Sequence, residues 1–198
     1  MTNKEGQKKP IKKRIDCLNI GCGINPIPCN ETERWFNLDM LDLKEYINND
    51  ERFKDKMVIF SQVNVDMEYP QISNLYRQNR FDKVLMADVI EHLYYPLGVM
   101  KDVWRACKHG AEIIINVPYQ GSKVAWSDFG HLREVNEIML MSLTEEFIES
   151  NIKQHTKFTP YFIDDRYNFK FNYLSHTFIT NQSGEVTMLR FIIKANKK

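Results

Sequence analysis

The chain has 198 residues, of which 43% are hydrophobic and 27% charged, and its formal net charge is +1 at pH 7. This composition is typical of one globular domain with an ordinary core, and the balanced charge gives no general attraction for nucleic acid or acidic membranes. Because no apolar run is long enough to cross a bilayer and the start of the chain is rich in lysine, we expect a cytoplasmic protein without membrane contact.

The lysine-rich start, residues 1–14, is predicted as a basic, flexible arm, and residues 15–198 as one domain. The first element expected within that domain is a strand over residues 15–20, which ends at Gly21-Cys22-Gly23. Two glycines spaced one apart after a strand let the backbone approach a ligand closely.

A second apolar run, residues 35–38, ends at Asp39. A carboxylate at the end of the neighbouring strand is placed to accept hydrogen bonds from ribose hydroxyls. The glycine turn and Asp39 together predict a ligand that contains adenosine, bound to a doubly wound α/β sheet.

The loop after the glycine turn narrows the choice of ligand. A dinucleotide site has a third glycine where this chain has Pro26, which removes a backbone donor and restricts φ. No Gly-Lys-Ser/Thr follows, so a phosphate-binding loop is also absent from the sequence. S-adenosylmethionine, an adenosine with an amino-acid tail and no phosphate, fits this loop better than NAD.

Strand-like and helix-like runs alternate further along the chain, which indicates parallel strands joined by helices. Further strands are predicted at residues 63–66, 81–87 and 111–117, and helices at 41–48, 71–78 and 96–108. Two β-rich runs, 171–180 and 186–195, flank Asn181-Gln182-Ser183-Gly184 and predict a hairpin that supplies strands six and seven.

Six segments occur in the order of a known motif set: Leu18 to Gly23, Trp35 to Asp39, Val63 to Asp66, Phe81 to Leu93, Arg105 to Gly110 and Asp128 to Arg133. On these motifs the chain resembles the class I S-adenosylmethionine-dependent methyltransferases, in particular the small type 11 domains. The match covers roughly residues 15–150, and it departs at His109, where the family has proline. The resemblance implies a Rossmann-like sheet of seven strands, mostly parallel with an antiparallel last strand.

The resemblance also implies the cofactor site. Gly21 and Gly23 would pass beneath the amino-acid end of S-adenosylmethionine, and Asn19 would contact its ammonium group or else be satisfied by the turn. The other implied contacts are Asp39 with the ribose, Asp66 with the adenine unless it is a solvated loop acid, and Ala87 and Asp88 with the methionine moiety.

His92 and His131 are candidates for a general base, because histidine titrates near neutral pH. His92 has an alternative role in packing the following helix. Arg133 is expected to bind an anionic group of the substrate or to hold a lid by a salt bridge. No metal site is predicted from Glu91, His92 and His131, because their separation in the sequence says nothing about geometry.

The sequence therefore predicts a methyltransferase that acts on an oxygen or nitrogen of a small molecule or a glycan precursor. A non-catalytic S-adenosylmethionine-binding module that acts through a partner protein, and aminopropyl transfer on the same fold, remain as alternatives. Nucleic acid is not the expected substrate, because Asn116-Val117-Pro118-Tyr119 follows strand five rather than strand four. Substrate recognition is assigned to loops 24–34, 119–136 and 152–170, and the four cysteines are predicted to be reduced and structural.

Overall fold

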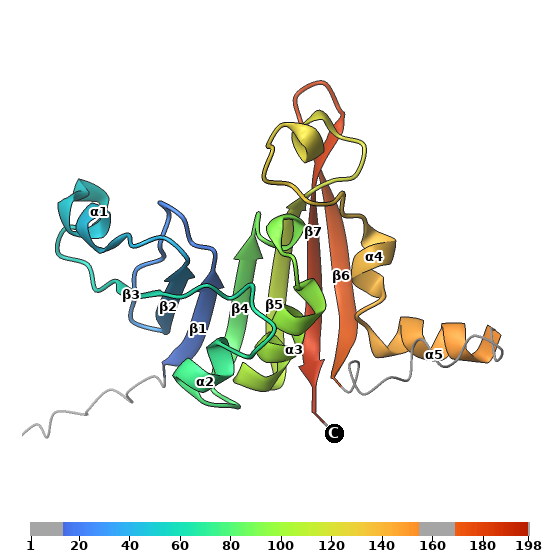
Figure 1. Cartoon of the computed structure of the whole chain (residues 1–198), viewed down its shortest axis with the longest axis horizontal. Helices are drawn as coiled ribbons and strands as arrows, with labels where there is room; N and C mark the ends of the chain where they lie inside the picture. Colours follow the sequence, from blue (N-terminus) through green and yellow to red (C-terminus); the bar gives the residue numbers. More distant parts are fainter. Residues whose placement is uncertain (1–13, 155–168, 198) are drawn as a thin grey trace, which may run out of the picture.

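The computed structural model describes residues 14–154 and 169–197. Their strands form a sheet of seven in the order β3-β2-β1-β4-β5-β7-β6 (Figure 1). The strands are β1 (Ile15–Ile20), β2 (Glu33–Asp39), β3 (Ile59–Gln62), β4 (Phe81–Ala87), β5 (Cys107–Pro118), β6 (Lys170–Thr180) and β7 (Val186–Asn196). Neighbours among β1 to β5 pair in parallel, whereas β7 runs antiparallel to both β5 and β6. The predicted sheet and its C-terminal hairpin are confirmed.

Helices lie in most of the connections between strands. They are α1 (Lys44–Asn49), η1 (Glu51–Phe53), α2 (Ile72–Tyr76), η2 (Ile90–His92), α3 (Pro96–Ala106), η3 (Lys123–Trp126), α4 (Glu137–Met141) and α5 (Glu145–Gln154). The connection from β1 to β2, residues 21–32, is described in full and contains no helix. The glycine turn therefore leads into an open coil at the carboxyl end of β1.

Alternation along the strands divides the core between the two faces of the sheet. Leu18 and Ile20 of β1 are fully buried in the main cluster, together with residues of α2, α3, β5 and β7. On the opposite face a smaller cluster joins Cys22 of the glycine turn to Ile47 of α1 and to Phe53. Helices thus pack on both faces of the sheet, as a doubly wound fold requires.

The third strand was predicted at the wrong residues, since β3 is Ile59–Gln62 and none of residues 63–66 belongs to it. After β3 the Asn64 side chain accepts a hydrogen bond from the Asp66 backbone N–H and turns the chain. The helix predicted at 71–78 ends at Tyr76. The helix before β5 ends at Ala106, and Cys107 already belongs to the strand. Of the predicted basic arm, all residues except Arg14 lie outside the described residues.

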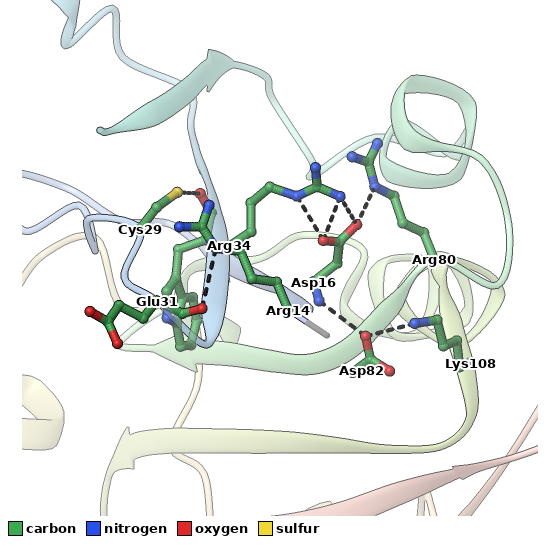
Figure 2. A network of polar contacts seen from close by, with 9 residues as sticks. Arg14, Asp16, Cys29, Glu31, Arg34, Arg80, Asp82 and Lys108 are labelled. Carbon is green, nitrogen blue, oxygen red and sulfur yellow. Dashed lines mark hydrogen bonds and ion pairs between the residues drawn. The ribbon is translucent and has the colours of Figure 1, made fainter. Parts of the chain in front are cut away.

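Charged side chains join the amino ends of four parallel strands (Figure 2). Asp16 of β1 accepts two hydrogen bonds of 2.8 Å from the Arg34 guanidinium of β2 and one of 3.2 Å from Arg80. Asp82 of β4 accepts from the Asp16 backbone N–H and from Lys108 of β5, at 3.0 and 2.7 Å. We call these five residues the amino-end network.

The cysteines are free, and three of them are buried. Burial raises the pKa of Cys17, Cys22 and Cys107 to about 12, so these thiols stay protonated at neutral pH. Among the residues described, no helix has the length and apolar character needed to cross a membrane.

Candidate functional site

The glycine turn after β1 needs both of its glycines, for different reasons. Gly21 and Gly23 have φ of +63° and +47°, a region that disfavours side chains. A Cβ on Gly21 would lie 2.6 Å from Cγ2 of Val89, so this glycine also permits close packing against the exit of β4. A Cβ on Gly23 would meet nothing within 4 Å, so the space over this second glycine is open to a ligand.

Asp39, at the end of β2, reaches across to the glycine turn. Its Oδ2 accepts a hydrogen bond of 2.8 Å from the Gly23 backbone N–H, and its Oδ1 accepts one of 3.0 Å from Leu41. A carboxylate has further acceptor positions beyond these two. The structure thus brings the glycine turn and the predicted ribose acceptor into direct contact.

Asn19 is buried within the sheet, where its Nδ2 donates to Oδ1 of Asn37 at 3.1 Å. Asn37 also exchanges two hydrogen bonds with the backbone of Ile27 and donates to Ile59. The two asparagines therefore anchor the coil of residues 21–32 to the sheet. A contact between Asn19 and an ammonium group remains a prediction.

Asp66 holds the start of α3. Its two carboxylate oxygens accept hydrogen bonds of 2.8 Å from the backbone N–H groups of Tyr94 and Tyr95, directly before Pro96. Orphan N–H groups at a helix entrance favour such a negatively charged acceptor. The side chain thus has a positioning task, and its predicted contact with adenine remains untested.

At the exit of β4, Ala87 pairs with Asn116 of β5, and the next residue turns sharply. Asp88 has φ of +54°, a conformation that aspartate adopts more readily than most residues. Its backbone N–H donates to the Asn116 carbonyl at 3.0 Å. Partial burial raises the pKa of Asp88, while His92 and His131 oppose that rise.

Glu91, His92 and His131 form a compact cluster beyond this turn. One ligand atom from each residue lies within 4.8 Å of the others, and the two imidazole rings meet edge to face with centroids 4.6 Å apart. The sequence singled out both histidines, and the structure brings them together from segments about 40 residues apart. We call these three residues the EHH cluster.

Backbone hydrogen bonds fix both rings of the cluster. Nδ1 of His92 lies 2.9 Å from the Gly130 carbonyl, and Nδ1 of His131 lies 2.6 Å from the Ala125 carbonyl. A carbonyl can only accept, so each Nδ1 carries the proton and each neutral ring has its lone pair on Nε2. The Leu132 N–H also donates to the Glu91 carbonyl at 2.9 Å, which ties the 128–133 loop to η2.

Glu91 was not among the predicted site residues, although it lies next to His92. Its side chain is buried, and neither carboxylate oxygen has a hydrogen-bond partner among the described residues. Burial raises the pKa of Glu91, and the charge of Asp88 adds to this effect, while the backbone N–H of Glu91 itself and the two imidazoles oppose it. An unpaired buried carboxyl is costly, which makes Glu91 a candidate functional residue.

A mostly apolar cavity of about 250 Å³ lies beside the cluster. Its walls include Ile90, Leu97, Met100, Met139, Leu140 and Arg133. One terminal nitrogen of Arg133 is buried without a partner among the described residues. The structure therefore places the predicted anion-binding arginine at a mostly apolar cavity.

No family model matches this sequence, and no curated protein matches it either. Solved structures do match. The N1-methyltransferase for 1,6-didemethyltoxoflavin from Burkholderia thailandensis, solved with that compound and S-adenosylhomocysteine, aligns with a TM-score of 0.56 over 93% of this chain and 72% of its own, at 14% identity. The chain has the fold of a class I methyltransferase.

Two further structures share this methyltransferase fold. The CurJ carbon methyltransferase aligns with a TM-score of 0.59 at 14% identity, over 96% of this chain and 50% of its own, so our chain spans about half its length. The [4+2]-cyclase SpnF aligns with a TM-score of 0.56 at 12% identity, over 95% of this chain and 77% of its own. Because one of these neighbours is named as a cyclase, the fold by itself does not determine the reaction.

Proposed function

We propose that this protein binds S-adenosylmethionine and transfers its methyl group to an oxygen or nitrogen of a small molecule or a glycan precursor. The observation that carries the proposal is the contact between Asp39 and the Gly23 N–H, because it joins the ribose acceptor to a glycine with open space above it. The methyltransferase bound to S-adenosylhomocysteine, which has the same fold, supports the choice of ligand.

Exposed apolar side chains follow the strand ends around this point. Ile24 comes directly after Gly23, and Met40 and Leu41 come directly after Asp39; their exposed fractions are 56%, 64% and 59%. An adenosine laid along the carboxyl ends of β1 and β2 would remove such surface from water, which favours binding. Tyr94, 73% exposed, is a further candidate for contact with the base.

Bound S-adenosylmethionine supplies a methyl group on sulfonium sulfur, which is already activated for transfer. The protein's own tasks are then to hold the acceptor in line with that methyl group and to exclude water. We assign acceptor orientation to the cavity beside the EHH cluster. Its apolar walls suit a hydrophobic acceptor body, and the buried, unpaired nitrogen of Arg133 suits an anionic group on that acceptor.

The loop of residues 119–136 is proposed to cover the acceptor. It carries two exposed aromatic side chains, Trp126 at 62% exposure and the fully exposed Phe129. Aromatic side chains of this kind stack on planar ligands and sugars. Of the third predicted recognition loop, residues 152–170, residues 155–168 lie outside the described residues.

The first test is calorimetric titration of the purified chain with S-adenosylmethionine, S-adenosylhomocysteine and NAD. We expect micromolar binding of the first two and none of NAD. An acceptor screen of anionic aromatic compounds and glycan precursors, read by S-adenosylhomocysteine release, tests turnover. Cofactor binding without turnover on any acceptor or in cell extract would favour the non-catalytic module, and release of methylthioadenosine would favour aminopropyl transfer.

Arg133 separates acceptor binding from cofactor binding. R133Q removes the charge and should raise the KM for an anionic acceptor while the affinity for S-adenosylmethionine stays unchanged. R133K keeps the charge and should lose less, although it cannot reproduce a bidentate contact. A parallel loss of cofactor affinity in both variants would show that Arg133 supports the fold of the site rather than the acceptor.

A further inference from the structure

We propose that Glu91, His92 and His131 bind one divalent transition-metal ion through one carboxylate oxygen and two imidazole nitrogens. Three observations carry this inference: the proximity of the three ligand atoms, the orientation of both rings, and the unpartnered carboxylate of Glu91. Nothing in the inference depends on methyl transfer, although the proposed acceptor cavity lies beside the site.

The orientation of the imidazoles is that of metal ligands. Histidines that bind metals usually donate their other ring N–H to a backbone carbonyl or a carboxylate, which fixes the tautomer and aims the lone pair. Both rings of the EHH cluster do so, His92 to the Gly130 carbonyl and His131 to that of Ala125. Each Nε2 therefore presents a lone pair in a fixed direction.

The third ligand is a buried charge that lacks a partner. The Glu91 side chain belongs to a residue only 1% exposed, and both of its oxygens lack hydrogen bonds among the described residues. A structural carboxylate of this fold is satisfied: Asp102, 4% exposed, accepts from the backbone N–H groups of Ile72 and Ser73 at 2.6 and 3.0 Å. A bound cation would supply what Glu91 lacks.

The distances fit one ion after a small closure. Ligand atoms that are each about 2.1 Å from an ion lie about 3–4 Å apart, slightly less than the 4.8 Å that bounds the present separations. The Glu91 carboxylate has no hydrogen-bond partner among the described residues, so its movement toward the rings breaks none of their hydrogen bonds. The loop that carries His131 is already tied to η2 by the Leu132 N–H.

The donor set also indicates the kind of ion. Imidazole nitrogen suits Zn²⁺ or Fe²⁺, whereas Mg²⁺ and Mn²⁺ prefer oxygen ligands, and Mg²⁺ retains bound water. Three protein ligands leave positions open on the ion, as in metal sites that also take a substrate or water. In this arrangement the two Nε2 atoms hold the cation, and neither imidazole acts as the general base that the sequence suggests.

The test uses the full-length chain without a histidine tag, freed of metal by a chelator and titrated with Co²⁺, Zn²⁺, Mn²⁺ and Mg²⁺. We expect one equivalent of Co²⁺ or Zn²⁺ to bind, visible absorption bands from ligand-bound Co²⁺, and much weaker Mg²⁺ binding. E91Q, H92Q and H131Q should each lose about 100-fold or more in Co²⁺ affinity, since even outer-shell changes cost 10–100-fold.

H109Q and H176Q are matched controls. His109 accepts from the Lys197 N–H and His176 contacts the Tyr173 hydroxyl, both outside the EHH cluster. They should bind Co²⁺ like the parent chain. Far-UV circular dichroism checks that each variant is folded. Failure of the parent chain to bind Co²⁺ or Zn²⁺, or binding that survives all three cluster substitutions, would overturn the proposal whatever the outcome of the S-adenosylmethionine titration.

Discussion

The two ends of the parallel strands differ in whether their carboxylates have hydrogen-bond partners. At the amino ends, Asp16 and Asp82 are held by arginine, lysine and backbone donors, so the charges of that network satisfy one another. At the carboxyl ends, Glu91 is more deeply buried yet has no partner among the described residues. The paired charges at the amino ends therefore stabilise the fold, whereas the carboxyl ends retain unpaired polar groups with which a ligand can form hydrogen bonds.

Side chains are also packed more closely at the amino ends of the strands than at the carboxyl ends. At the amino ends, the Arg80 guanidinium lies 4.2 Å from the ring centroid of Phe36, and Phe36, Tyr76 and Phe81 pack edge to face at 5.3–5.7 Å. At the carboxyl ends, the glycine turn leaves open space over Gly23. The comparison predicts that changes at one end alter stability and changes at the other alter binding.

The largest expected effect is an exception to this prediction, because Gly21 lies at the carboxyl end of β1 and yet its substitution should change stability. G21A should lower the free energy of unfolding by about 2–4 kcal/mol, from positive φ together with overpacking against Val89. Urea unfolding measures the loss. The double variant G21A/V89A should recover part of the Gly21 effect relative to V89A alone, whereas G23A should cost only about 1 kcal/mol. Equal losses in G21A and G23A would contradict the contact with Val89.

Substitution of Asp39 tests whether changes at the carboxyl ends of the strands alter binding. D39A should weaken S-adenosylmethionine binding by about 1–3 kcal/mol, the range for a lost hydrogen bond to a charged group. Calorimetry measures the affinity. D42A is the matched control, since the exposed Asp42 accepts a local hydrogen bond from the Lys44 N–H. An affinity unchanged in D39A, or reduced equally in D42A, would remove the ribose assignment.

Opposite signs are expected for two substitutions that each remove one negative charge. D16N leaves Arg34 and Arg80 without their acceptor charge and should cost about 1–2 kcal/mol of stability. E91Q removes a buried charge with no partner, so metal-free protein should keep its stability or gain it. Chemical unfolding of both variants compares them directly. A loss of more than about 1 kcal/mol in E91Q would mean that the fold itself uses the Glu91 charge.

Local patterns were enough to predict the sheet, the hairpin and the residues of the glycine turn. Strand alternation and turn residues are encoded by neighbours in sequence, and two strand ends in a parallel sheet meet at one edge. The proximity of the glycine turn to Asp39 follows from that rule, whereas the hydrogen bond between the Gly23 N–H and Asp39 was not predicted.

Long-range contacts decided what the sequence missed. Asp66 satisfies N–H groups 28 and 29 residues away, which no local pattern indicates. The EHH cluster depends on a loop that folds back so that Leu132 binds the Glu91 carbonyl. Burial without a partner, the property that makes Glu91 interesting, exists only in three dimensions.

The smallest expected effect concerns Glu33 at the start of β2, and its dependence on pH distinguishes it from the others. Hydrogen bonds from the Trp35 indole, at 3.0 Å, and from the Lys83 ammonium, at 3.1 Å, lower the pKa of Glu33 below its ordinary value of 4.5, against the opposing effect of burial. A depressed pKa means that the folded state favours the ionised carboxylate. Its contribution is therefore present above about pH 4.5 and is lost as the pH falls through the folded-state pKa.

E33Q should accordingly lower stability by up to about 1 kcal/mol at pH 7, the range of partly exposed ion pairs, and the difference from the parent chain should close in acid. Thermal unfolding of both proteins between about pH 3 and pH 7, a range that includes the titration of carboxyl groups, measures that difference. E31Q is the control, because Glu31 is exposed two residues away and should show no such closure. A constant difference across this range would mean that Glu33 acts through packing and not through its charge, and the amino ends would then owe less to electrostatics than Asp16 and Asp82 indicate.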